Sequence, residues 1–152
     1  MKRIIYFKKF LFAIIFIPLI SINSQDLTAF NMIGKKLSAV IADYGKPVHH
    51  DKSNLEMECV FYKEKDYQMV FVANQKGVYH VQGFKIFNDK NSAHKTMNKL
   101  LADCSKKGFK IDTLNVSEFD LRAKNIEVNI SMFENPHSHK YEIKIDAFKR
   151  EG

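Results

Sequence analysis

The chain has 152 residues, of which 45% are hydrophobic and 27% charged, and it carries a formal net charge of +7 and two cysteines. The length fits one domain, and the share of apolar residues excludes a chain that is disordered throughout. Four basic residues and no acidic ones fall within residues 1–24, so the remaining chain carries only +3, with its lysines interleaved with acids. Since nucleic-acid binding needs a concentrated basic surface, we expect no nucleic-acid partner.

The first 24 residues have the pattern of a secretory signal peptide. Lys2 and Arg3 precede an unbroken apolar run of eleven residues, 10–20, and small polar residues follow from Ser21. A basic start, a short apolar core and a small-residue exit are typical of a cleaved signal. A membrane-spanning helix needs roughly 20 apolar residues, so the run is too short for one. We expect cleavage after Ser24, with an uncleaved anchor as the alternative.

The region around the cleavage site contains no cysteine, so no residue there could carry a lipid anchor. Residues 25–152 are therefore expected to form a single periplasmic or secreted domain, with no membrane span once the signal is removed.

The first element of this domain is predicted to be a helix over 32–44. Its apolar residues recur at the spacing of one helix face, with Asn31 as the N-cap. Gly45 would end the helix, and Pro47 would prevent it from resuming.

Three strands are expected next, because apolar residues then recur with a period of two. They are predicted over 55–61, 67–73 and 78–87. The second is apolar on both faces at residues 70–72. The buried face of the first strand is predicted to hold Leu55, Met57, Cys59 and Phe61.

The second half of the domain repeats this order. A helix is predicted from residues at the same spacing, each 60 positions after its counterpart, namely Ala93, Met97, Leu100, Leu101 and Cys104. Residues 109–121 are expected to hold one or two short strands. Two clear strands follow, over 125–133 and 141–147, with apolar residues at alternate positions.

The element order α-β-β-β-α-β-β-β predicts an α+β fold in which two α-β-β-β units form an antiparallel sheet with two helices packed on one face. The units would be residues 31–87 and 91–148. An internal duplication explains this repeat; the alternative is that two amphipathic helices simply look alike.

Several residues of the first half follow a known structural pattern. They are Gly34, the helix 37–44, the turn Gly45-Lys46-Pro47, the aromatic pair Phe61-Tyr62, the strand 69–72 and the turn Gly77-Val78. This segment resembles the SmpA/OmlA module of bacterial envelope proteins, which is similar in fold to the tandem domains of the β-lactamase-inhibitor protein. The resemblance implies a periplasmic protein-binding module and not an enzyme.

The two cysteines, Cys59 and Cys104, are both predicted to face the core. In an oxidising compartment such a pair favours a disulfide, which would stabilise the fold by about 4 kcal/mol. The alternative is two buried thiols that act as small apolar side chains.

No group of residues meets the requirements of a catalytic, cofactor or metal site. His49 and His50 are adjacent in an extended segment, so their side chains would point to opposite sides. His137 and His139 lie in a polar loop beside Pro136. The chain has no zinc-binding motif, nucleophile elbow or phosphate-binding loop.

We therefore expect a non-catalytic module that binds an envelope or secreted protein. Its binding surface would be the open face of the sheet or the loops around His49 and Pro136. The alternative is a protein that binds a small ligand, lipid or cell-wall fragment in a cleft between sheet and helices, lined by residues such as Tyr79, Phe84 and Phe87.

The signal predicts the first residue of the exported protein. Protein recovered from the envelope of an expressing bacterium should begin at Gln25 and lack residues 1–24. Intact-mass and N-terminal peptide mass spectrometry would measure this. A membrane-bound chain that keeps Met1 would instead show an uncleaved anchor.

Overall fold

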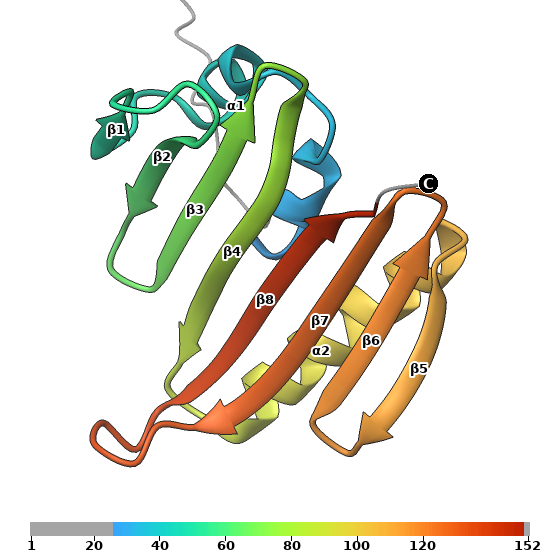
Figure 1. The fold of residues 1–152 in the computed structure, drawn as a ribbon. Helices are drawn as coiled ribbons and strands as arrows, with labels where there is room; N and C mark the ends of the chain where they lie inside the picture. The colour runs from blue at the N-terminus through green and yellow to red at the C-terminus, as the bar shows by residue number, and fades with distance from the viewer. Residues whose placement is uncertain (1–25, 151–152) are drawn as a thin grey trace, which may run out of the picture.

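The computed structural model describes residues 26–150, so the predicted signal peptide lies outside the described residues. A 3-10 helix and an α-helix come first, then four strands, a long helix and four more strands (Figure 1). These elements are η1 (Asp26–Met32), α1 (Leu37–Tyr44), β1 (His49–Asp51), β2 (Glu58–Lys63), β3 (Tyr67–Asn74), β4 (Gly77–Phe87), α2 (Lys90–Lys106), β5 (Lys110–Asn115), β6 (Glu118–Ala123), β7 (Ile126–Glu134) and β8 (Tyr141–Lys149).

All eight strands form one antiparallel sheet in the order β1-β2-β3-β4-β8-β7-β6-β5. The two runs of four strands therefore meet at β4 and β8, which pair along their length from His80 with Phe148 to Phe87 with Tyr141. Strands β1 and β5 are the outer edges (Figure 1). The predicted α+β class and antiparallel sheet are confirmed.

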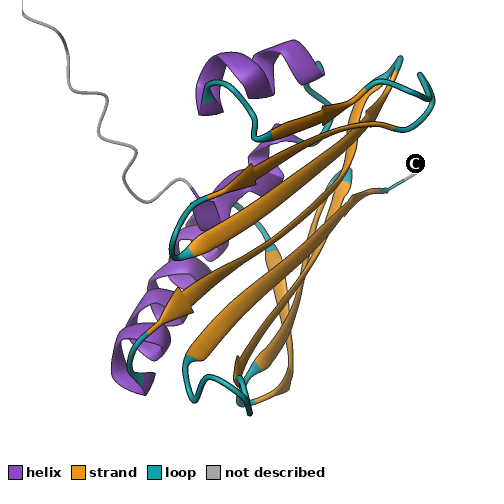
Figure 2. Ribbon diagram, turned by 90° about the vertical axis from the view of Figure 1, so that its left-hand side faces the viewer, coloured by secondary structure: helices purple, strands orange, loops and turns teal. Residues whose placement is uncertain are grey.

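The helices cover one face of the sheet and leave the other uncovered (Figure 2). Fully buried side chains from strands of both halves point toward the helices, in register across the sheet from Phe71 through Val81, Ala147 and Val128 to Leu121. Helix α2 adds Met97 and Leu100 to this core, and α1 packs the ring of Tyr44 against Phe71 at 5.0 Å. Burial of these apolar side chains is the main stabilising term.

Helix α2 agrees with its prediction. Ala93, Met97, Leu100 and Cys104 are buried. Its N-cap is Asp89, whose carboxylate accepts a hydrogen bond from the backbone N–H of Ser92 at 2.8 Å.

The first helix begins later in the chain than the sequence predicted. Residues up to and including Met32 form η1, and α1 begins only at Leu37, after Lys36 rather than Asn31. The interruption comes from Gly34, whose φ of 84° lies in the left-handed region. Gly34 also donates its backbone N–H to the carbonyl of Val78 at 2.7 Å, so this segment bonds to β4 instead of continuing a helix.

The first strand was predicted one residue out of register. Its buried residues are Val60 and Tyr62, whereas Leu55 and Met57 are 67% and 56% exposed. Leu55 and Met57 precede the strand, which begins only at Glu58, and including them in the alternation shifted the assignment by one residue. The sequence also predicted three strands where the first half has four, because β1 is only three residues long.

The register predicts which substitutions destabilise the protein. Ile145→Ala should lower the free energy of unfolding by about 2–5 kcal/mol, because it leaves a cavity at a residue that is 1% exposed. Leu114→Ala, at a residue that is 60% exposed, should change it by less than about 0.5 kcal/mol. Chemical denaturation followed by circular dichroism measures both. Equal losses of unfolding free energy in the two variants would contradict the strand register described above.

Candidate functional site

The open face, meaning the side of the sheet away from the helices, carries an apolar zone where β2, β3 and β4 cross it. Successive strand residues point to opposite faces, so the neighbours of the buried residues point outward here. The apolar zone consists of Cys59, Phe61, Val70, Val72, Phe84 and Ile86, each only partly buried.

The side chains of the apolar zone lie beside one another across the strands. Phe61 pairs with Val70, and Cys59 pairs with Val72. Side chains paired in this way have Cβ atoms about 4.5–5.5 Å apart, so these four form a continuous apolar surface. On β4, Gln82 and His80 lie opposite the two valines, and Phe84 pairs with Gln68, so it meets Val70 only diagonally. This surface is a consequence of the segment 70–72, which the sequence had shown to be apolar on both faces.

His80 and Asp146 lie on the open face where the two halves of the sheet meet. His80 Nε2 and Asp146 Oδ1 are 2.7 Å apart, and Gln82 donates to the other carboxylate oxygen at 3.5 Å. The ring of Phe148 stacks on the imidazole at 4.5 Å with an interplanar angle of 7°. These contacts fix the orientation of the histidine.

A His–Asp pair also occurs in nucleophilic triads, which need a serine or cysteine within hydrogen-bond reach of the histidine. The thiol of this face, Cys59, lies two strands from His80, with Val72 between them. Two strand spacings are about 10 Å, so Cys59 does not complete a triad. The pair offers a hydrogen-bonding centre beside an apolar surface.

The other half of the open face, where β5 to β8 cross it, is an acidic zone. Its carboxylates are Asp112, Glu118, Asp120, Glu127, Glu142 and Asp146. Its basic residues are Lys110, Arg122 and Lys144, together with Arg150, which lies 3.9 Å from Glu127, so six acids face four bases.

Arg122 joins the acids of the outer strands. Its guanidinium nitrogens lie 3.3 Å from Asp112, 3.8 Å from Asp120 and 3.8 Å from Glu127. Asn129 donates to Asp120 at 2.6 Å. Within residues 26–150, no group of three or more histidine, cysteine or acidic side chains is arranged to hold a metal ion.

The two cysteines lie on opposite sides of the sheet. Cys59 belongs to the open face and is half-buried, whereas Cys104 is buried on α2, and both are free thiols. The predicted inner-face position of Cys59 is wrong because the strand register was shifted by one residue. The predicted disulfide is absent, because the sheet separates the two sulfurs.

The remaining histidines of the sequence analysis do not come together. His49 pairs with Phe61 and His50 with Val60, which places the two on opposite faces. His50 Nε2 lies 2.7 Å from a carboxylate oxygen of Glu58. His137 and His139 are exposed in the loop between β7 and β8.

The sequence analysis missed the His80–Asp146 pair. The two residues are 66 positions apart, so no local sequence motif identifies them as a pair. Only the register between β4 and β8 brings them together, and a sequence pattern does not specify that register.

Comparisons with known proteins do not identify a family. No family model and no curated protein sequence matches the chain. Among solved structures, an extracellular protein containing an SCP domain from Bacillus anthracis str. Ames is 14% identical, with a TM-score of 0.42. The match covers 77% of this chain and 44% of that one. The resemblance to the SmpA/OmlA module therefore stays a prediction.

The positions of the two thiols predict different reactivities. Burial raises the pKa of the Cys104 thiol to about 11, so roughly 0.1% of it would be thiolate at pH 8. A disulfide reagent added to the native protein at pH 8 should therefore react rapidly with one thiol, Cys59. Absorbance of the released thiol measures the number of thiols that react.

Single-residue variants show which cysteine reacts rapidly with the reagent. Cys59→Ser should abolish the rapid phase, Cys104→Ser should leave it unchanged, and unfolding in guanidinium should release the second thiol of the native sequence. A native protein with no reactive thiol in either the folded or the unfolded state would show that the disulfide forms after all.

Proposed function

We propose that this protein is an exported, non-catalytic module of the bacterial envelope that binds another protein through the open face of its sheet. The observation that carries the proposal is the apolar zone. Phe61, Val70 and Val72 form part of a continuous apolar surface that the helices do not cover. Contiguous exposed apolar surface on a folded protein is typical of an interaction site.

The charges around the apolar zone define the chemistry of the partner. The acidic zone adjoins the apolar zone along β8, and His80 with Asp146 marks the boundary between them. A complementary partner would place apolar side chains over β2 to β4 and basic side chains over β5 to β8. Such complementarity speeds association and fixes the orientation of the partner.

Export and the internal repeat are parts of this proposal. Residues 1–24 support export, with the mature chain in the periplasm or outside the cell. No helix within residues 26–150 is long and apolar enough to cross a membrane. The sheet order, in which each run of four strands follows a helix, supports two duplicated units, and the SmpA/OmlA resemblance agrees with a binding module.

The proposal predicts that one substitution on the open face weakens partner capture. Tagged mature protein should enrich one envelope protein at near-equal stoichiometry from a native extract, measured by quantitative mass spectrometry. Val70→Lys places a charge in the apolar zone and should reduce that enrichment at least about tenfold, because buried contacts at the centre of an interface dominate affinity.

Asn98→Lys is the matched control. It adds the same charge at an exposed position of α2, on the opposite side of the molecule, and should leave the enrichment unchanged. Circular dichroism would show that both variants fold. Equal enrichment by Val70→Lys and the native protein would move the interface away from the open face. No enrichment above a mock control, even after mild cross-linking, would overturn the proposal.

A further inference from the structure

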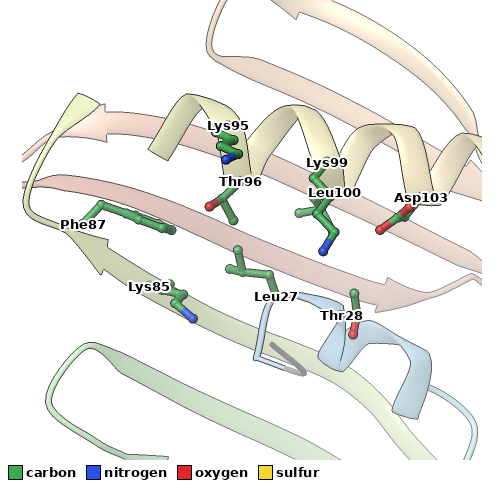
Figure 3. A pocket seen from close by; sticks show the side chains of 9 residues that line it. All are labelled: Leu27, Thr28, Lys85, Phe87, Lys95, Thr96, Lys99, Leu100 and Asp103. Carbon is green, nitrogen blue, oxygen red and sulfur yellow. The ribbon is translucent and has the colours of Figure 1, made fainter. Parts of the chain in front are cut away.

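A cavity of about 480 Å³ lies on the helix side of the sheet, between η1, β4 and α2. Figure 3 shows its lining from close by. Leu27, Phe87 and Leu100 contribute apolar surface, and Thr96 of α2 lies beside them. This volume falls within the roughly 300–1,000 Å³ of small-molecule sites.

The apolar lining is built from three separate elements. Leu27 comes from η1, Phe87 from the end of β4 and Leu100 from α2. Leu27 and Leu100 are 6% and 5% exposed, so both belong to the core as well as to the cavity wall. The floor of the cavity therefore belongs to the packed core, while its sides include exposed side chains such as those of Lys95 and Lys99.

The rim of the cavity is cationic. Lys85 lies on the helix side of β4, and Lys95 and Lys99 follow one another along a face of α2. Among the lining residues that the structure describes, the acid is Asp103, which also forms an ion pair with Lys106 at 3.9 Å. Lys85 already has an interaction of its own, so the charge of the entrance rests on the other two lysines. The exposed ammonium groups of Lys95 and Lys99 against one paired carboxylate give the entrance a net positive charge.

We infer that this cavity binds a single-chain amphiphile with an anionic head. The hydrocarbon chain would lie against Leu27, Phe87 and Leu100, and the head would remain at the rim beside Lys95 and Lys99. An uncharged ligand would make no use of the charges of Lys95 and Lys99, and a cationic one would be repelled by them. A carboxylate and a phosphate share the required chemistry, since lysine binds either as a point charge.

This site is independent of the proposed function. The cavity lies on the helix side of the sheet, while the proposed protein interface lies on the open face. Substitutions at its rim should therefore leave partner capture unchanged. The two proposals can fail separately.

The test is isothermal titration calorimetry on protein purified from the envelope without detergent and freed of apolar ligands on a hydrophobic resin. Three probes share a ten-carbon chain: decanoate, decyl phosphate and decyltrimethylammonium. All are used below the concentrations at which they form micelles. Both anions should bind at one site per molecule, and the cation should bind at least about tenfold more weakly. The tighter of the two anions identifies a carboxylate or a phosphate as the natural head group.

Two variants locate the binding. The first is a double variant, Lys95→Glu with Lys99→Glu, which should lower the affinity for the anions about tenfold or more. Each exposed charge contributes only modestly to binding, but the variant replaces two attractive charges with two repulsive ones. The control, Lys124→Glu with Lys140→Glu, makes the same change of net charge at exposed residues outside the cavity and should have no effect. Thr96→Phe should fill the cavity and weaken binding while leaving every charge in place. Thermal denaturation would show that the variants fold.

Each outcome decides the inference. Binding of the anions that is lost in the two cavity variants and kept in the control supports it. Equal affinity for the cationic probe would overturn the assignment of an anionic head. Binding that is unchanged by Thr96→Phe would overturn the site itself. So would the absence of binding by both anions at concentrations up to about 1 mM, where even weak association is detected.

Discussion

The pairing between β4 and β8 is the constraint on which the rest of the structure depends. These two strands end the two halves of the chain, and their hydrogen bonds turn two small sheets into one of eight strands. Val81 beside Ala147 and Gly83 beside Ile145 make the core continuous across the junction. Gly83 suits this packing, because a Cβ there would lie 2.5 Å from the sulfur of Met69 and 3.0 Å from the backbone oxygen of Gln68, so the buried Met69 side chain would have to move.

The junction also determines what lies on each side of the sheet. Since side chains alternate, the register that buries Val81 and Ala147 also places His80 and Asp146 together on the open face. Helices cover one side only, so the molecule has a packed core on one face and a surface of side chains on the other. The cavity beside α2 arises on the covered side, where η1 and α2 approach β4 without filling all the space between them.

The sequence predicted the elements whose pattern is long and regular. Helix α2 and strands β7 and β8 were predicted with the correct buried residues, because a period of 3.6 or of two persists through each of them. The predictions failed where one residue changed the pattern. Gly34 interrupts the first helix, and the loop residues Leu55 and Met57 continued an alternation that the strand itself does not follow. The shifted register also placed Cys59 in the core.

The candidate site was predictable only in part. The apolar zone has a local signal, because Val70, Phe71 and Val72 form an apolar run in which one face must remain outside the core. The histidine–aspartate pair and the cavity have none, because each joins side chains from distant segments. Tyr79, Phe84 and Phe87 were predicted to line one cleft, but Phe87 lines the cavity, Phe84 lies on the open face and Tyr79 lines a separate depression.

The two edges of the sheet limit how the protein associates with others. An exposed edge strand can recruit a strand from another molecule and so lead to aggregation. Strand β1 offers only three residues for such pairing, and the register of β5 shifts between Thr113 and Asn115. Both edges are therefore poor templates for strand addition, which protects a sheet of this width against end-to-end polymerisation. Recognition then depends on the side chains of the two faces and not on the backbone of the edges.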